Sequence, residues 1–176
     1  RGHAAKPPDR PVLRQHGPPH RQDCRPAPAG PGPGDGGQGR WRIPFAHHPL
    51  FSAGPQHHNT RGMERLLPLF ERSGVRVMFT GHEHNFQHSR VPGLDHFVTG
   101  AAGKLRRTPP DRFIEAATVS WGTDCHFLLA QLAGDRMTVR AIGERASPGD
   151  PPTDIVRRDP QGRVVASAME IRLGNG

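Results

Sequence analysis

The stretch "GVRVMFTGHEHNFQH", residues 74–88, joins a near-continuous apolar run to a group of imidazoles. Residues 75–80 predict a strand that is covered on both faces, because a strand with one face in water would alternate polar and apolar side chains. Gly81 follows directly and removes a side chain where the chain must turn sharply. The pair His82 and His84 comes next. The sequence therefore predicts a buried strand whose carboxyl end carries functional groups.

A helix and a short strand are predicted before this stretch. Residues 63–74, "MERLLPLFERSG", place apolar side chains at helical spacing and finish on Gly74, a natural helix stop. Pro68 within that segment predicts a kink or a late first turn. Residues 41–46, "WRIPFA", predict a short strand that Pro44 confines to an edge or a bulge. The order strand, helix, strand predicts a βαβ unit with two parallel strands.

Antiparallel strands are predicted to follow this unit. Residues 95–104, "DHFVTGAAGK", predict one short strand that ends in a glycine-rich turn. Residues 125–144 predict a hairpin, in which Gly134 and Asp135 form the turn between two apolar runs. Residues 162–173, "GRVVASAMEIRL", alternate like a last strand. The predicted fold class is therefore α/β.

The first 40 residues differ in composition from the rest of the chain. The sequence has 176 residues, of which only 33% are hydrophobic, with 22 Gly and 20 Pro. Nine of the prolines fall within residues 1–40, where Val12 and Leu13 are the only large apolar side chains. Such a segment cannot bury enough apolar surface to offset the entropy of ordering it. We predict a disordered low-complexity tail over 1–40 and a folded domain over 41–176.

The charge pattern argues against a nucleic-acid-binding module. The formal net charge is +8 and the isoelectric point is about 11.2, and cationic proteins do gather at phosphate backbones. However, the arginines are scattered, with short pairs only at 106–107 and 157–158, and no basic helix appears. No specific nucleic-acid partner is expected.

Other features of the sequence bear on compartment and membrane association. Cys24 and Cys125 are too few for a disulfide framework or a CxxC zinc site. No apolar run is long enough to span a bilayer, so no membrane association is expected. The first ten residues, "RGHAAKPPDR", lack both Met and an apolar signal core. The chain is therefore expected either to be a fragment or to carry no export signal of its own, and its compartment and oligomeric state are left unassigned.

Histidines follow both predicted parallel strands at their carboxyl ends, where sites form in α/β sheets. His47 or His48 is expected to converge there with His82 and His84. These last two are two positions apart, so on an extended backbone their side chains would point the same way. Neutral imidazole is a common ligand for zinc-, iron- and manganese-type sites. We predict that the imidazoles of His47, His82 and His84 lie within several ångströms of one another.

Each candidate site residue, taken alone, also has an interpretation without a functional role. His47 or His82 alone is typical of a partly buried, hydrogen-bonded histidine. His57 and His58, in "GPQHHNT", are typical of polar loop residues, and Glu83 of a solvated carboxylate. The joint arrangement at two strand ends favours the metal site.

Two segments taken together resemble a known family. "WRIPFAHHPLFSAG" (41–54) followed by "GVRVMFTGHEHNFQH" is similar to the C-terminal half of the calcineurin-like metallophosphoesterases, and among them to the purple and tartrate-resistant acid phosphatases. His47 with Pro49 fits the family's "GH-x-P" type motif, and "GHEH" fits its "GHxH" motif. The resemblance covers residues 41–144 and implies half of an αββα fold, a β-sandwich flanked by helices.

The resemblance also implies a dinuclear site of iron, zinc or manganese that hydrolyses phosphate monoesters. By motif matching, His47 and His82 would bind one metal ion and His84 the other. In the acid phosphatases further histidines follow the first ligand and touch the substrate phosphate. His57 and His58 stand at the corresponding distance, so either would stabilise the phosphate and protonate the leaving alcohol.

The same resemblance implies supporting roles for two residues beside the motif histidines. Glu83 and Asn85 flank the motif histidines and would orient the metal ligands through hydrogen bonds. The expected partner of such a site is a phosphate-ester substrate.

The family's earlier motifs are absent from this sequence: a "DxH" strand end, a "GDxx" aspartate after a strand, and a "GNH" asparagine. Three histidines without a bridging carboxylate cannot reproduce a two-metal site, so we expect at most one metal ion. The favoured interpretation is a truncated phosphoesterase that is weakly active or inactive. Two alternatives are a non-catalytic protein that binds a single metal ion and, least favoured, a basic nucleic-acid-binding module.

Overall fold

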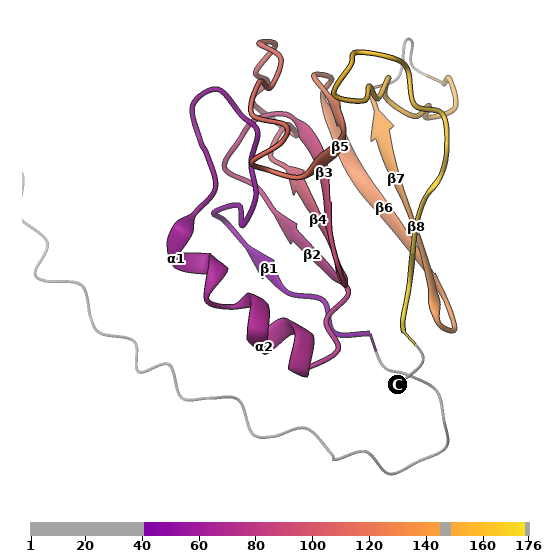
Figure 1. Cartoon of the computed structure of the whole chain (residues 1–176). Helices are drawn as coiled ribbons and strands as arrows, with labels where there is room; N and C mark the ends of the chain where they lie inside the picture. The colour runs from indigo at the N-terminus through magenta and orange to yellow at the C-terminus, as the bar shows by residue number, and fades with distance from the viewer. Residues whose placement is uncertain (1–40, 145–148, 175–176) are drawn as a thin grey trace, which may run out of the picture. The chain divides into compact units, whose positions relative to one another are not determined.

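Two β-sheets pack face to face in the described part of the chain, residues 41–144 and 149–174 of a computed structural model (Figure 1). The first sheet has the strand order β1-β2-β4-β3-β5 and the second has the order β6-β7-β8. The strands are β1 (Phe45–Ala46), β2 (Val77–Thr80), β3 (Phe86–Val91), β4 (Leu94–Thr99), β5 (Thr118–Gly122), β6 (His126–Ala133), β7 (Arg136–Gly143) and β8 (Met169–Arg172). The tail predicted over 1–40 lies outside the described residues.

The predicted βαβ unit is confirmed. β1 and β2 pair in parallel, with Phe45 beside Phe79. The strand expected over 95–104 among the antiparallel strands is β4, which ends at Thr99 and pairs in parallel with the other side of β2, so that part of the prediction is wrong. The connection contains two short helices, α1 (Arg61–Glu64) and α2 (Leu67–Arg72). Pro68 lies in the first turn of α2, where a missing backbone N–H leaves no helix bond unmade. The helical segment therefore divides in front of the proline, as its position predicts.

The lengths of two strands differ from the prediction. Residues 41–46 were expected as one strand, but only the last two form β1, because Pro44 has no N–H to donate to a ladder. The last strand was expected over 162–173, and β8 occupies only its second half. The hairpin of β6 and β7 around Gly134 is confirmed, with that glycine at φ 60°.

Two strands of the first sheet, β3 and β5, were not predicted. β3 lies antiparallel to β4 and to β5, and the two-residue turn at Pro92-Gly93 joins it to β4. Its interior positions carry Gln87, His88 and Ser89, all of them buried. Because these side chains are polar, they hide the apolar pattern by which a buried strand is usually recognised.

The core has two parts, one on each face of β2. Val77 and Phe79 point toward the second sheet and pack in one cluster with Met137 and Ile171. Met78 points to the opposite face, into a cluster that contains buried Phe70 of α2 and buried Leu50. Both faces of β2 are thus covered, as its continuous apolar sequence predicts. Neither helix in the described ranges has the length and apolar character needed to cross a membrane.

A fully buried histidine in this core makes folding sensitive to acid. His96 on β4 has its Nε2 2.9 Å from the hydroxyl oxygen of Thr80, and its Nδ1 has no hydrogen-bond partner in the described part of the chain. Burial, and secondarily the charge of His88, lowers the pKa of His96 from 6.5 to about 3. The histidine is therefore neutral in the folded protein at pH values where the unfolded chain binds a proton.

We predict a loss of stability as the pH falls from about 6.5 toward 3, because in that window the unfolded state binds one more proton at this site. A single such group contributes a slope of about 1.4 kcal/mol per pH unit. Substituting His96→Gln should flatten the pH dependence of the unfolding free energy, measured by urea denaturation at several pH values. Some slope should persist, because burial also lowers the pKa of His88 and of His126. Equal slopes for the variant and the unchanged chain would contradict this assignment.

Candidate functional site

Four imidazoles gather at the carboxyl ends of β1 and β2. The ring of His82 lies 4.9 Å from that of His47, 4.4 Å from that of His48 and 3.8 Å from that of His57, measured between centroids. The Nδ1 of His82 is 3.0 Å from the Nε2 of His47. These four residues are called the imidazole cluster below. The expected convergence of the two strand ends is therefore present for His47 and His82, and it includes His48 and His57.

Backbone pairing beyond the strands explains why the ends converge. The N–H of Gly81 donates to the carbonyl oxygen of His47 at 3.1 Å, which continues the ladder of β1 and β2 by one step. The chain then turns sharply, because the N–H of Glu83 donates back to the carbonyl of Gly81 at 2.8 Å. This is the hydrogen-bond pattern of a γ-turn, with His82 at its centre.

The expected extended backbone at His82 is wrong. His82 has a φ of 67°, in the left-handed region that a side chain with a Cβ rarely adopts. In a turn, two residues two positions apart do not share a face as they do in a strand. The side chains of His82 and His84 therefore do not point the same way.

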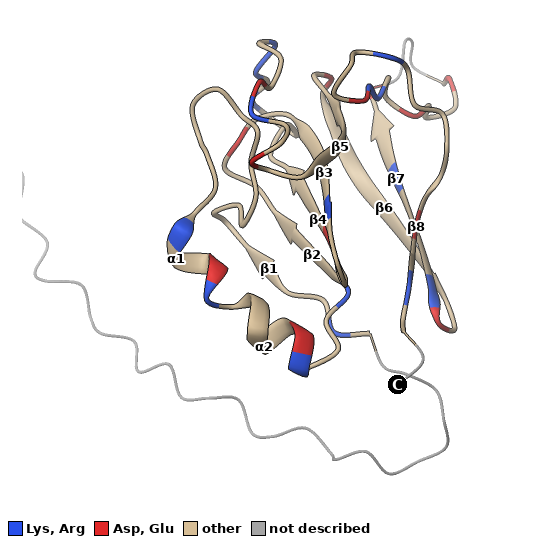
Figure 2. Ribbon diagram, in the orientation of Figure 1, with Lys and Arg blue, Asp and Glu red and all other residues tan. Residues whose placement is uncertain are grey.

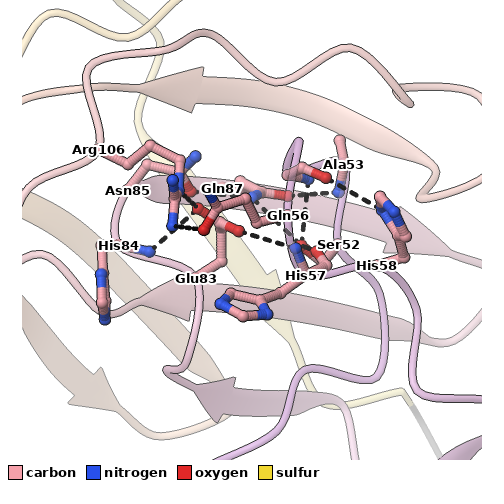
Figure 3. A network of polar contacts seen from close by, with 11 residues as sticks. Ser52, Ala53, Gln56, His57, His58, Glu83, His84, Asn85, Gln87 and Arg106 are labelled. Atoms are coloured by element: carbon pink, nitrogen blue, oxygen red, sulfur yellow. Dashed lines mark hydrogen bonds and ion pairs between the residues drawn. The ribbon is translucent and has the colours of Figure 1, made fainter.

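His84 stands apart from the imidazole cluster. Figure 3 shows His84 and His57 on either side of Glu83. Burial lowers the pKa of His84, and the positive charges of Lys104 and Arg106 lower it further. Among the described residues, His84 does not form a three-ligand metal site with His47 and His82.

Burial favours the neutral form of His82. It lowers the pKa of His82 below 6.5, and the charges of His57, His48 and His47 add to this effect, while Glu83 opposes it.

Glu83 is a buried carboxylate with three donors, not a solvated one. Its side chain is fully buried. Oε1 accepts from Nε of Arg106 and from the backbone N–H of His84 at 3.3 Å, and Oε2 accepts from the backbone N–H of His57 at 3.2 Å (Figure 3). A buried charge is tolerated when it is paired and hydrogen-bonded in this way.

Two glycines make room for Glu83. A Cβ on Gly54 would come within 2.5 Å of the carboxylate oxygen Oε2, and a Cβ on Gly100 would overlap the backbone carbonyl oxygen of Glu83. Both glycines therefore allow a close approach that no other residue permits. Glu83 therefore packs directly against two residues that have no side chain, Gly54 and Gly100.

The loop at 52–59 distinguishes His57 from His58. The side-chain oxygen of Ser52 donates to the carbonyl of His57 at 2.6 Å, and the ring of His57 lies against His82. His58 is exposed, and its Nδ1 donates to the carbonyl of Gly54 at 3.1 Å. The sequence left His57 and His58 as alternatives, and the structure brings only the first into the imidazole cluster.

Amide side chains connect this loop to β3. The backbone N–H of Ala53 donates to Oε1 of Gln87 at 2.7 Å, and Nε2 of Gln87 donates to Oδ1 of Asn85 at 2.8 Å. Asn85, predicted to orient metal ligands, is fully buried within this network and does not contact the imidazole cluster through these bonds. Sequence reasoning missed Gln87, Ser52 and Arg106, because none stands in a local pattern and their partners are distant in the chain.

The residues present do not fit a two-metal centre. Within 41–144 and 149–174, no three His, Cys, Asp or Glu side chains are arranged to hold a metal ion. The carboxylate nearest in sequence to the cluster, Glu83, is occupied by its three donors. His47 and His82 offer two nitrogens to a shared point, fewer than structural or catalytic zinc sites use.

An apolar cavity borders the imidazole cluster. It has a volume of about 800 Å³ and lies between β1 and β6, where Ala46 and Gly81 form the part of its wall next to the histidines. Phe45, Phe79 and Phe127 are among its other lining residues. Acidic and basic positions are interspersed along the described chain (Figure 2).

Comparison with known proteins gives a match of fold. No protein-family model and no curated protein matches the chain. Among solved structures, it is similar to the purple acid phosphatase PPD1 from yellow lupin (Lupinus luteus) seeds, with a TM-score of 0.51 and 17% identity over 74% of this chain and 24% of that chain. The chain has part of the metallophosphoesterase fold.

Two further solved structures are similar at lower scores. GAP50, the anchor in the inner membrane complex of Plasmodium, has a TM-score of 0.48 and 15% identity over 62% of this chain and 34% of that chain. Vacuolar Protein Sorting 29 from Cryptosporidium parvum has a TM-score of 0.36 and 17% identity over 65% of this chain and 46% of that chain. The chain spans less than half the length of each of the three proteins.

Close packing against Glu83 gives a direct test of this local structure. Gly100→Ala should destabilise the fold by about 1–3 kcal/mol, because its Cβ would force the backbone of Glu83 to move. Gly103→Ala is the matched control, since nothing lies within 4 Å of the added Cβ, and it should change the unfolding free energy by no more than about 0.5 kcal/mol. Urea denaturation measures both. Similar losses in the two variants would show that the close approach at Gly100 is not a constraint.

Proposed function

We propose that the imidazole cluster binds the phosphate of a phosphate monoester, and that the chain is the histidine-bearing part of a phosphoesterase of the acid phosphatase type. The observation that supports this most directly is the meeting of four imidazoles at the carboxyl ends of the parallel strands. The fold likeness to a purple acid phosphatase supports the same reaction class. Binding sites in open α/β sheets form at this edge.

Imidazoles suit a phosphate group in two ways. A ring N–H donates a hydrogen bond to a phosphate oxygen, and a protonated ring adds a charge-assisted bond that is stronger than a neutral one. Burial and the neighbouring imidazoles lower the pKa of His82, and the negative charge of a bound phosphate would favour its protonated form. In this proposal His57 donates a proton to the leaving alcohol, since imidazole acts as a general acid near neutral pH.

The neighbouring cavity suggests the alcohol portion of the substrate. Its lining is mainly aliphatic and aromatic, and it meets the cluster at Ala46 and Gly81. An aryl or other apolar alcohol would fill such a space while its phosphate lies among the imidazoles. An aryl phosphate is therefore the preferred test substrate.

A second candidate function is the binding of one metal ion without catalysis. The 3.0 Å distance between Nδ1 of His82 and Nε2 of His47 is one that two ligands of a single ion also adopt. Zinc, iron or manganese suits imidazole, and at most one ion is expected because no carboxylate stands free beside the cluster. Nucleic-acid binding is the least supported alternative, given the interspersed charges in Figure 2.

Calorimetry with inorganic phosphate and with Zn²⁺, alongside hydrolysis of an aryl phosphate, separates these functions. Phosphate should bind, and His57→Ala or His82→Ala should weaken its binding by about 10- to 100-fold, because a hydrogen bond to a charged group contributes about 1.5–3 kcal/mol. The exposed His58→Ala is the matched control and should bind as the unchanged chain does. Hydrolysis by the chain alone should be barely above background.

Each outcome favours one function. A chain that binds one Zn²⁺, weakened by His82→Ala, and no phosphate would support the metal-binding protein and reject the phosphate site. Equal effects of His57→Ala and His58→Ala would also reject it. Hydrolysis at ordinary enzyme rates would support the phosphoesterase and contradict the expectation of weak activity.

A further inference from the structure

We propose that Glu83 and Arg106 act as a positioning pair, which holds the ring of His57 against His82 without either residue touching the phosphate. The consequence for phosphate binding rests on the proposed function. The geometric part, that the pair fixes the distance between the two rings, stands independently of it.

His57 is held by its backbone on both sides. Its N–H donates to Oε2 of Glu83, and its carbonyl oxygen accepts from the side chain of Ser52. With both peptide groups fixed, the direction of the Cα–Cβ bond is fixed, and the ring centroid lies 3.8 Å from that of His82. Loss of the Glu83 acceptor would release one of the two restraints.

Arg106 joins three segments that are far apart in sequence. Its Nε donates to Oε1 of Glu83, its Nη2 donates to Oε1 of Gln56 at 2.6 Å, and its backbone N–H donates to the carbonyl of His84 at 2.7 Å. One guanidinium therefore contacts both the turn after β2 and the residue before His57. The planar fork of arginine makes such simultaneous bonds, and a lysine ammonium does not reproduce them.

Burial distinguishes this pair from the exposed ion pairs of the described residues, although His88 and Asp95 form a second buried pair. The side chain of Glu83 is 0% exposed and that of Arg106 is 16% exposed, whereas Arg140 and Asp154 pair with 45% and 49% of their side chains exposed. Exposed pairs contribute little to stability. A buried carboxylate that loses its cation leaves an uncompensated charge, so the surrounding structure must move.

The side chain and the backbone of Glu83 both lie close to neighbouring glycines. Gly54 approaches its side chain and Gly100 its backbone, so a movement of either would displace the loop at 52–59 or the turn at His82. A local change in the pair is thus transmitted to the two rings. This coupling is what separates a positioning pair from a pair that only stabilises the fold.

The test uses the full chain and two measurements. The nuclear Overhauser effect between the ring protons of His57 and His82 reports their distance, and calorimetry with inorganic phosphate reports binding. The variants are Glu83→Gln, Arg106→Lys and the double variant Glu83→Gln/Arg106→Gln, in which two neutral amides hydrogen-bond. Val139→Ala, in the core between the sheets, is the control for lost stability alone.

In Glu83→Gln and in Arg106→Lys, we expect the nuclear Overhauser effect between the rings of His57 and His82 to disappear. We also expect phosphate binding to weaken by about 10- to 100-fold. The double variant should recover part of the nuclear Overhauser effect and part of the phosphate affinity, because it leaves no uncompensated buried charge. Val139→Ala should keep the nuclear Overhauser effect and the phosphate affinity of the unchanged chain. If Glu83→Gln does not fold, Arg106→Lys and the double variant still decide the question.

Two results would overturn the inference. One is a ring-to-ring effect that persists unchanged in Arg106→Lys and in the double variant. The other is an equal loss in Val139→Ala. If the unchanged chain binds no phosphate, the proposed function fails, and the ring-to-ring measurement alone still tests the positioning pair.

Discussion

The buried carboxylate of Glu83 is the constraint around which the candidate site is arranged. A carboxylate removed from water needs donors for both oxygens, and here these come from Arg106 and from two backbone N–H groups of other residues. To reach those donors, the loop at 52–59, the turn after β2 and the segment that follows β4 must come together. The requirement for partners therefore joins three parts of the chain that are distant in sequence.

The imidazole cluster follows from that arrangement and from the parallel pairing of two strands. β1 and β2 bring His47 and His82 to one edge, because parallel strands end on the same side of a sheet. The loop then adds His57 through the backbone bond to Glu83. Strand pairing sets the coarse position of the cluster, and the buried charge sets its detail.

Sequence reasoning was sufficient where apolar periodicity carries the information and insufficient where polar groups are buried. The run at 75–80 predicted β2 and its two covered faces, and Pro68 predicted the division of the helical segment. β3 was not predicted because its interior holds Gln87 and His88, whose burial depends on partners supplied by other strands and loops. No local sequence pattern indicates such partners.

The same distinction applies to the site. The convergence of His47 and His82 follows from topology and was predictable from two strand ends. The positive φ of 67° at His82 was not predicted, because the sequence indicated an extended backbone at that position. The role of Arg106 could not be predicted from the sequence either, because it depends on a contact with a residue 23 positions away.

The positive φ of His82 has an evolutionary reading. A non-glycine residue in the left-handed region costs on the order of 1–3 kcal/mol relative to an unstrained conformation, and glycine would adopt it without that penalty. Replacing His82 by glycine would therefore reduce the backbone strain of the turn and remove the ring at the centre of the cluster. A sequence shaped by folding alone would have glycine at this position. Histidine at residue 82 therefore carries a local backbone strain that glycine would not, and it supplies the ring against which those of His47, His48 and His57 lie.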